Sequence, residues 1–112
     1  VAERGKQIAF SPHRLFLVRP AFDGQERGGH AHIACWQTLI CISGGCTVHV
    51  DDSLNKKSIR LEEPDRYLTI PSGIWSSQIY DTRDSTLLVL CDLPFDENDY
   101  MRDYEDFLKF RA

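Results

Sequence analysis

Residues 24–44 have the sequence GQERGGHAHIACWQTLICISG, which places a His-x-His pair between two glycine-containing turns. The pair consists of His30 and His32. Side chains alternate along an extended segment, so residues separated by one position point to the same side. The spacing therefore predicts two neighbouring imidazoles on one face of a β-strand, as a site built into a β-scaffold.

The composition predicts one domain without a strongly charged or membrane-spanning segment. The chain has 112 residues and a formal net charge of −4, with acidic and basic residues interspersed, which argues against nucleic acid as a partner. No apolar run approaches the roughly 20 residues of a membrane span, and no signal peptide is visible, so a cytoplasmic protein is expected. From this length, residues 1–112 are interpreted as a single domain. Because the sequence starts at Val1, this domain is also interpreted as one that can belong to a larger protein.

The four cysteines, Cys35, Cys41, Cys46 and Cys91, are interpreted as buried, small apolar residues. None of them forms a C-x-x-C pair, and the first three lie in or beside strongly apolar segments. Free thiols in a reducing compartment are therefore favoured over disulfides or a zinc site.

Runs of apolar and alternating residues predict an all-β fold. Short strands separated by Gly- and Pro-containing turns are expected at residues 13–19, 36–42, 46–51, 57–61, 66–70, 74–80 and 85–91. Seven or eight short strands at this spacing favour a sandwich or a jelly-roll barrel.

One helix is expected after Pro94. Apolar and aromatic residues recur at helical spacing from Tyr100 to Leu108, which predicts an amphipathic helix that covers the sheet. Asp96 or Asn98 is expected to cap its start.

A functional role for His30 and His32 is favoured over a structural one. Burying two imidazoles without hydrogen-bond partners is costly, and titratable groups cluster at functional sites. His49 is a lone histidine on an alternating strand and is expected to face solvent. His13 is not part of a comparable histidine pair.

The His-x-His segment resembles the first motif of the cupin superfamily, in which two histidines and a following glutamate bind a metal inside a small barrel. Here Gln37 stands at the glutamate position, and Ser76 stands where the second motif, at residues 71–76, would supply a third histidine. Two strong ligands are fewer than a stable catalytic metal site normally uses. No metal and no other cofactor is therefore expected, and the two imidazoles are better suited to moving protons.

A narrower resemblance covers the chain from about Ile8 onward. Three segments resemble motifs of the sugar-nucleotide 3,4-ketoisomerases. They are Ile8-Ala9-Phe10-Ser11, Arg27-Gly28-Gly29-His30-Ala31-His32 and residues 95–104, FDENDYMRDY. The combination of the two longer motifs is specific to that family.

This resemblance implies a metal-free cupin jelly roll that forms homodimers with an exchanged N-terminal strand. It also implies a reaction on dTDP-4-keto-6-deoxyglucose that moves the keto group between C4 and C3 through an enediol. His32 would be the base at C3 and His30 the shuttle between the two oxygens, and these two roles can be exchanged. Arg27 is expected to contact a phosphate or orient the substrate, and Gln37, Trp75 and Tyr67 are expected to contribute to its binding.

The sequence also departs from the family. The family carries a tyrosine for proton delivery in the strand that matches residues 14–18, where this chain has Phe16 and Leu17. Tyr67, Thr69 and Tyr80 are candidates for a replacement hydroxyl. Two alternatives to the enzyme follow: a cupin that binds a sugar nucleotide without turnover in support of another enzyme, and, with less support, a metal-dependent cupin oxygenase.

Overall fold

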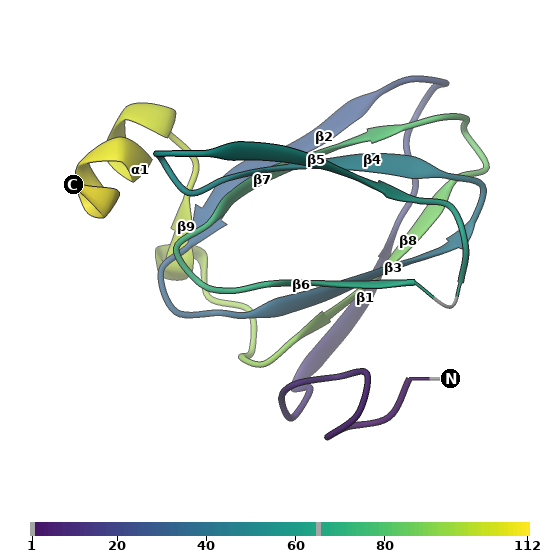
Figure 1. Ribbon diagram of the computed structural model, residues 1–112, viewed down its shortest axis with the longest axis horizontal. Coiled ribbons are helices and arrows are strands. Elements are labelled where there is room, and N and C mark those ends of the chain that lie inside the picture. Colours follow the sequence, from purple (N-terminus) through teal and green to yellow (C-terminus); the bar gives the residue numbers. More distant parts are fainter. Residues whose placement is uncertain (1, 65) are drawn as a thin grey trace.

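The computed structural model describes residues 2–64 and 66–112, and these residues form two antiparallel β-sheets packed face to face (Figure 1). One sheet has the order β1-β8-β3-β6, which are Arg14–Val18, Thr86–Cys91, Gln37–Ser43 and Tyr67–Ile70. The other has the order β5-β4-β7-β2-β9, which are Lys56–Leu61, Cys46–Asp51, Trp75–Tyr80, Glu26–His32 and Tyr100–Met101. Within these described residues one α-helix, α1 (Tyr104–Arg111), follows β9, so the predicted all-β jelly roll with one C-terminal helix is confirmed.

The strands form where side-chain alternation predicted them. In β4, Cys46 and Val48 are fully buried between the sheets, whereas Thr47 and His49 lie on the outer face and are partly exposed. His49 there places its Nδ1 2.8 Å from the hydroxyl of Ser58 on β5. Strand β8 lies between β1 and β3, and five of its six residues are buried, which agrees with a sequence that is apolar on both faces.

The main core lies between the two sheets. Its fully buried members come from both of them and include Val48 and Tyr80 from the five-stranded sheet and Leu39, Leu87 and Cys91 from the four-stranded sheet. The four predicted free cysteines are all buried and unpaired, as expected.

The start of the helix differs from the prediction. Asp96 caps only a short 3₁₀ helix, η1 (Glu97–Asp99), and Tyr100 and Met101 then pair with β2 as strand β9. The α-helix begins at Tyr104 because Asp103 caps it, accepting hydrogen bonds from the backbone N–H groups of residues 105 and 106. Residues 100 and 101 therefore form a strand despite their helical spacing, because β2 offers backbone groups with which they can pair.

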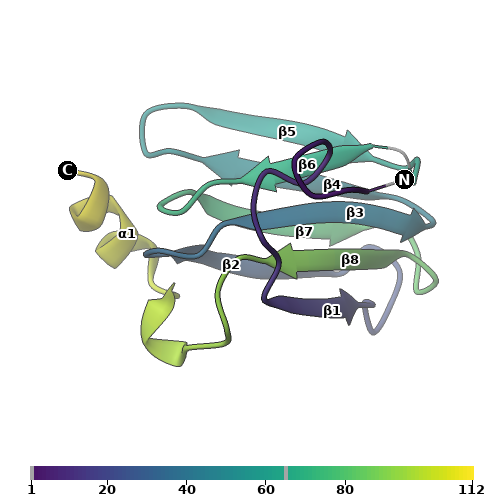
Figure 2. The same ribbon diagram turned by 90° about the horizontal axis from the view of Figure 1, so that it is seen from below.

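The outer face of the four-stranded sheet is only partly covered. Figure 2 shows the segment before β1 crossing this face, where Ile8 is 5% exposed. Leu15 and Leu17 on the edge strand β1 remain 60% and 58% exposed. Among residues 2–64 and 66–112, the structure contains no helix with the length and apolar character needed to cross a membrane.

Candidate active site

Strand β2 positions both histidines. It pairs with β7 through a register shift between Gly28 and His30, and with β9 through Ala31 and His32. Gly28 has φ +88°, and a Cβ at this position would lie 3.0–3.2 Å from atoms of Ser76, Ser77 and Gln78 on β7. A glycine is therefore required where the strand bends ahead of the histidine pair.

His32 is held by a carboxylate from a distant part of the sequence. Its Nδ1 lies 2.9 Å from Oδ2 of Asp99, which precedes β9. The backbone N–H groups of Ala34 and Cys35 donate to the same carboxylate at 2.7 and 3.3 Å, so Asp99 is fixed in turn. A proton on Nδ1 that is donated to Asp99 leaves the lone pair of a neutral His32 on Nε2.

The environment keeps His32 neutral near neutral pH. Its side chain is buried, and the pKa of His32 is lowered by this burial, against the opposing effect of the Asp99 carboxylate. Its Nε2 is buried and has no hydrogen-bond partner among the described residues. An oriented, neutral imidazole with a free lone pair is the form that a general base requires.

His30 is the second neutral imidazole. Burial, with smaller contributions from the neighbouring His32 and Arg102, lowers the pKa of His30 to about 4. The ring centroids of His30 and His32 are 5.1 Å apart, so the two side chains are neighbours as predicted.

Tyr100 lies beside both histidines. Its ring centroid is 4.3 Å from that of His32 and 5.1 Å from that of His30. Arg14 on β1 donates a hydrogen bond of 3.0 Å to the Tyr100 hydroxyl oxygen. The hydroxyl proton of Tyr100 therefore remains available to another acceptor.

A cavity of about 330 Å³ lies between the sheets next to these groups. Its apolar lining comes from the four-stranded sheet: Phe16, Val18, Leu39, Leu87 and Val89. Its polar lining consists of Arg27, His30, Gln37, Gln78, Tyr100 and Arg102. His30 forms part of the cavity wall, and the ring of His32, which does not line the cavity, lies next to that of His30.

The structure brings only some of the predicted site residues together. His30, Arg27 and Gln37 line the cavity, and His32 adjoins it. Trp75 does not line it: on β7 it points to the opposite side from Ser76 and Gln78, and its indole packs against the rings of Tyr104 and Phe107.

The predicted hydroxyl donors also lie elsewhere. Tyr67 pairs with Ile40, and strand alternation puts both on the opposite face from the cavity-lining Leu39. Thr69 contacts Thr38, with 3.0 Å between their hydroxyl oxygens. Tyr80 is fully buried in the main core, and this burial raises its pKa.

Sequence reasoning missed Asp99, Tyr100, Arg102, Gln78 and Arg14. The first three lie in the FDENDYMRDY segment that carried the family resemblance, but the helical interpretation hid their proximity to β2. Gln78 could have been found by alternation, because it lies two residues after the inward-facing Ser76.

The donor set does not fit a cupin metal centre. Gln37 directs its amide Nε2 toward the sulfur of Cys91, 3.4 Å away, and Ser76 occupies the position of the third histidine. An amide and a hydroxyl are weak ligands for transition metals, so His30 and His32 alone would have to hold the ion.

Two antiparallel sheets with a His-x-His pair at the cavity between them are typical of the cupin class of protein. Within this class, residues 1–112 match the family described as FdtA, WxcM-like, C-terminal, and the chain belongs to this family. The TDP-4-oxo-6-deoxy-alpha-D-glucose-3,4-oxoisomerase of Aneurinibacillus thermoaerophilus is 33% identical over 110 residues, which cover 98% of this chain and 79% of the relative.

Solved ketoisomerase structures share the fold. A 3,4-ketoisomerase from Helicobacter canadensis superposes with a TM-score of 0.89 at 33% identity, over 99% of this chain and 84% of the other. The sugar 3,4-ketoisomerase from Thermoanaerobacterium thermosaccharolyticum, in complex with TDP, gives 0.93 at 28% identity, over 99% and 81%. A histidine-to-asparagine variant of the latter enzyme was solved with TDP-4-keto-6-deoxyglucose and gives 0.91 at 28% identity, over 99% and 80%.

Proposed function

We propose that this chain is a 3,4-ketoisomerase of a dTDP-linked 4-keto-6-deoxyhexose. The observation that carries the proposal is the pair of adjacent, neutral histidines at the cavity, one of them oriented by Asp99. The family membership and the activity of the relatives support the same substrate class.

The reaction requires three proton movements and no change in oxidation state overall. One proton leaves C3 of the 4-keto sugar and one is later delivered to C4, while a further proton passes from the C3 oxygen to the C4 oxygen. We assign His32 as the base at C3, because Asp99 fixes its tautomer and leaves the Nε2 lone pair free. His30, on the cavity wall, is assigned as the shuttle between the two oxygens.

Tyr100 is proposed to supply the hydroxyl that the family draws from the strand now occupied by Phe16 and Leu17. It is the tyrosine of the cavity lining, and it lies beside both imidazoles. The hydrogen bond from Arg14 orients its oxygen and stabilises negative charge on it. Arg27 and Arg102, both exposed, are proposed to contact the diphosphate.

The test is exchange of the C3 proton of dTDP-4-keto-6-deoxyglucose with deuterium, followed by NMR in deuterated buffer. The proposal expects exchange well above that of an enzyme-free control, together with formation of the 3-keto product. Binding of dTDP without any exchange would contradict it and favour the binding-module alternative, for which the absence of a hydroxyl at Phe16 is the supporting observation. The oxygenase alternative has no support from the donor set described above.

The homodimer is proposed on a separate feature, the exposed leucines of the edge strand β1. Leu15 and Leu17 present apolar side chains at a sheet edge, which association would cover. Light scattering at micromolar concentration is expected to give twice the mass of the chain. A monomeric mass would contradict this expectation and leave the catalytic proposal untouched.

A further inference from the structure

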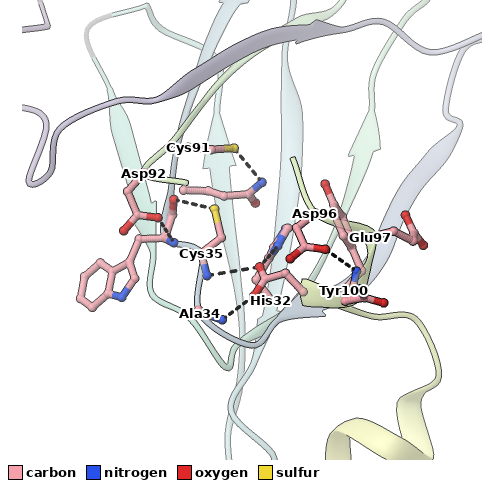
Figure 3. A network of polar contacts seen from close by, with 12 residues as sticks. His32, Ala34, Cys35, Cys91, Asp92, Asp96, Glu97 and Tyr100 are labelled. Carbon is pink, nitrogen blue, oxygen red and sulfur yellow. Dashed lines mark hydrogen bonds and ion pairs between the residues drawn. The ribbon is translucent and has the colours of Figure 1, made fainter. Parts of the chain in front are cut away.

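Three potential metal ligands meet on the Nδ1 side of His32. The ligand atoms of His32, Cys35 and Asp99 all lie within 4.8 Å of one another, in the part of the chain that the structure describes. Figure 3 shows His32 at the end of β2 and Cys35 in the turn that follows it. Asp99 is the last residue of η1. Among them only Asp99 and His32 are needed for the proposed reaction, so the thiol of Cys35 has no function there.

The donor chemistry of this cluster is that of a site for a thiophilic cation. One imidazole nitrogen, one thiol sulfur and one carboxylate oxygen are the ligand types that Zn²⁺ uses, at about 2.0–2.3 Å each. The backbone N–H groups of Ala34 and Cys35 already hold the carboxylate, in the manner of the outer-sphere hydrogen bonds that orient metal ligands. Water would complete four-coordination.

We propose that His32, Cys35 and Asp99 form a binding site for a thiophilic divalent cation such as Zn²⁺, and that occupation of this site inhibits the isomerase. The binding claim stands on the cluster alone, whereas the inhibition rests on the proposed function. This site is distinct from a cupin metal centre, because it involves neither Gln37 nor Ser76 and uses Nδ1, the nitrogen that faces Asp99.

Inhibition follows from the single lone pair of a neutral imidazole. Without the ion, the proton of His32 lies on Nδ1 and the lone pair on Nε2 serves as the base. A cation that binds Nδ1 replaces the proton there and needs a lone pair on that nitrogen. The ring proton then lies on Nε2, which can no longer accept the C3 proton. The thiol of Cys35 loses its proton to solvent when it coordinates. No oxidation or reduction is involved.

The binding arm uses chelator-treated protein titrated with Cd²⁺, whose thiolate complexes absorb in the near ultraviolet, with Zn²⁺ as the competitor. The proposal expects one Cd²⁺ per chain and a thiolate absorption that Zn²⁺ removes. Cys35→Ala is expected to lose the absorption and to bind Zn²⁺ at least about 10-fold more weakly. Cys41→Ala, which removes another buried thiol outside the cluster, serves as the matched control and keeps both. Equal absorption in wild type and Cys35→Ala would overturn the site.

The activity arm measures C3-proton exchange with increasing Zn²⁺. Inhibition of wild type and Cys41→Ala, with at least about a 10-fold weaker effect on Cys35→Ala, supports the proposal. Equal inhibition of all three proteins, or stoichiometric binding without inhibition, overturns the inhibitory role. A chelated wild type that exchanges no proton contradicts the proposed function instead, and the cadmium titration then still decides whether the site exists. Circular dichroism of each variant establishes that it is folded.

Discussion

The two walls of the cavity differ in chemistry. The wall from the four-stranded sheet presents Phe16, Val18, Leu39, Leu87 and Val89, with Gln37 as its polar member. The wall from β2, β7 and β9 presents His30, Gln78 and Tyr100, with Arg27 and Arg102 at its ends. The groups that we propose to transfer protons are thus concentrated on one sheet, while the other sheet supplies most of the apolar lining of the cavity.

Among the substitutions on the polar wall, removal of the proposed base should have the largest effect on the rate of C3-proton exchange. His32→Asn is expected to lower the rate of C3-proton exchange by about 10²–10⁴-fold, because a general base contributes on this scale to rate. Affinity for dTDP, measured by calorimetry, should stay within about 10-fold of wild type. His49→Asn, which removes a histidine on the outer face of β4, is the matched control and should exchange normally. Loss of exchange in both variants would argue against a specific role for His32.

Because His30 on the polar wall is largely buried, the free energy of unfolding should depend on pH. The pKa of His30 is about 4 in the folded protein, against 6.5 for an ordinary histidine, so the unfolded chain binds more protons between these values. The free energy of unfolding should therefore fall as the pH is lowered from about 6.5 to about 4, by about 1–3 kcal/mol from this residue. Denaturant unfolding across this range checks it. His30→Asn should flatten the slope, and an unchanged slope would contradict the assignment.

Arg27 tests whether the polar wall also binds the nucleotide. Arg27→Ala is expected to weaken dTDP binding by about 10-fold, the loss of one charge-assisted contact, with a smaller change in the maximal exchange rate. Calorimetry measures the affinity, and saturation kinetics measure the rate. Arg66→Ala removes an exposed arginine that does not line the cavity and should bind dTDP as wild type does. Equal affinities of the two variants would exclude a specific contact from Arg27.

The smallest change in exchange rate is expected when a hydroxyl group is added to the apolar wall. Phe16 lines the cavity, whereas Leu17 points outward and is 58% exposed. Phe16→Tyr is therefore expected to raise the exchange rate by a few-fold, roughly 1 kcal/mol of barrier or less, and Leu17→Tyr should leave it unchanged. An increase for Leu17→Tyr would show that the missing hydroxyl acts from another direction. No increase for either would support Tyr100 as a sufficient donor.

The sequence predicted local features better than contacts between distant segments. Alternation located the strands and the paired histidines, because the period of two is a property of each strand alone. The same rule applied to β7 separates Trp75 from the inward-facing Ser76 and Gln78, and so would have removed Trp75 from the predicted site. Asp99 was beyond such reasoning, since it meets His32 only through the pairing of residues 67 positions apart.

The error at the helix has a similar cause. Tyr100 and Met101 have apolar side chains at helical spacing, but the edge of β2 offers them backbone hydrogen bonds that no local pattern reveals. Propensity and periodicity are weak where a neighbouring strand needs a partner. Asp103 was the better capping residue, and the chain enters the helix only after that pairing is complete.

The separation of His32 from Asp99 also has a consequence during synthesis. A ribosome completes all strands of the four-stranded sheet, and β2 with both histidines, before the segment that carries Asp99 and Tyr100 emerges. Until η1 and β9 dock, His32 lacks its carboxylate and the cavity lacks its tyrosine, so the proposed site is incomplete until this segment has docked.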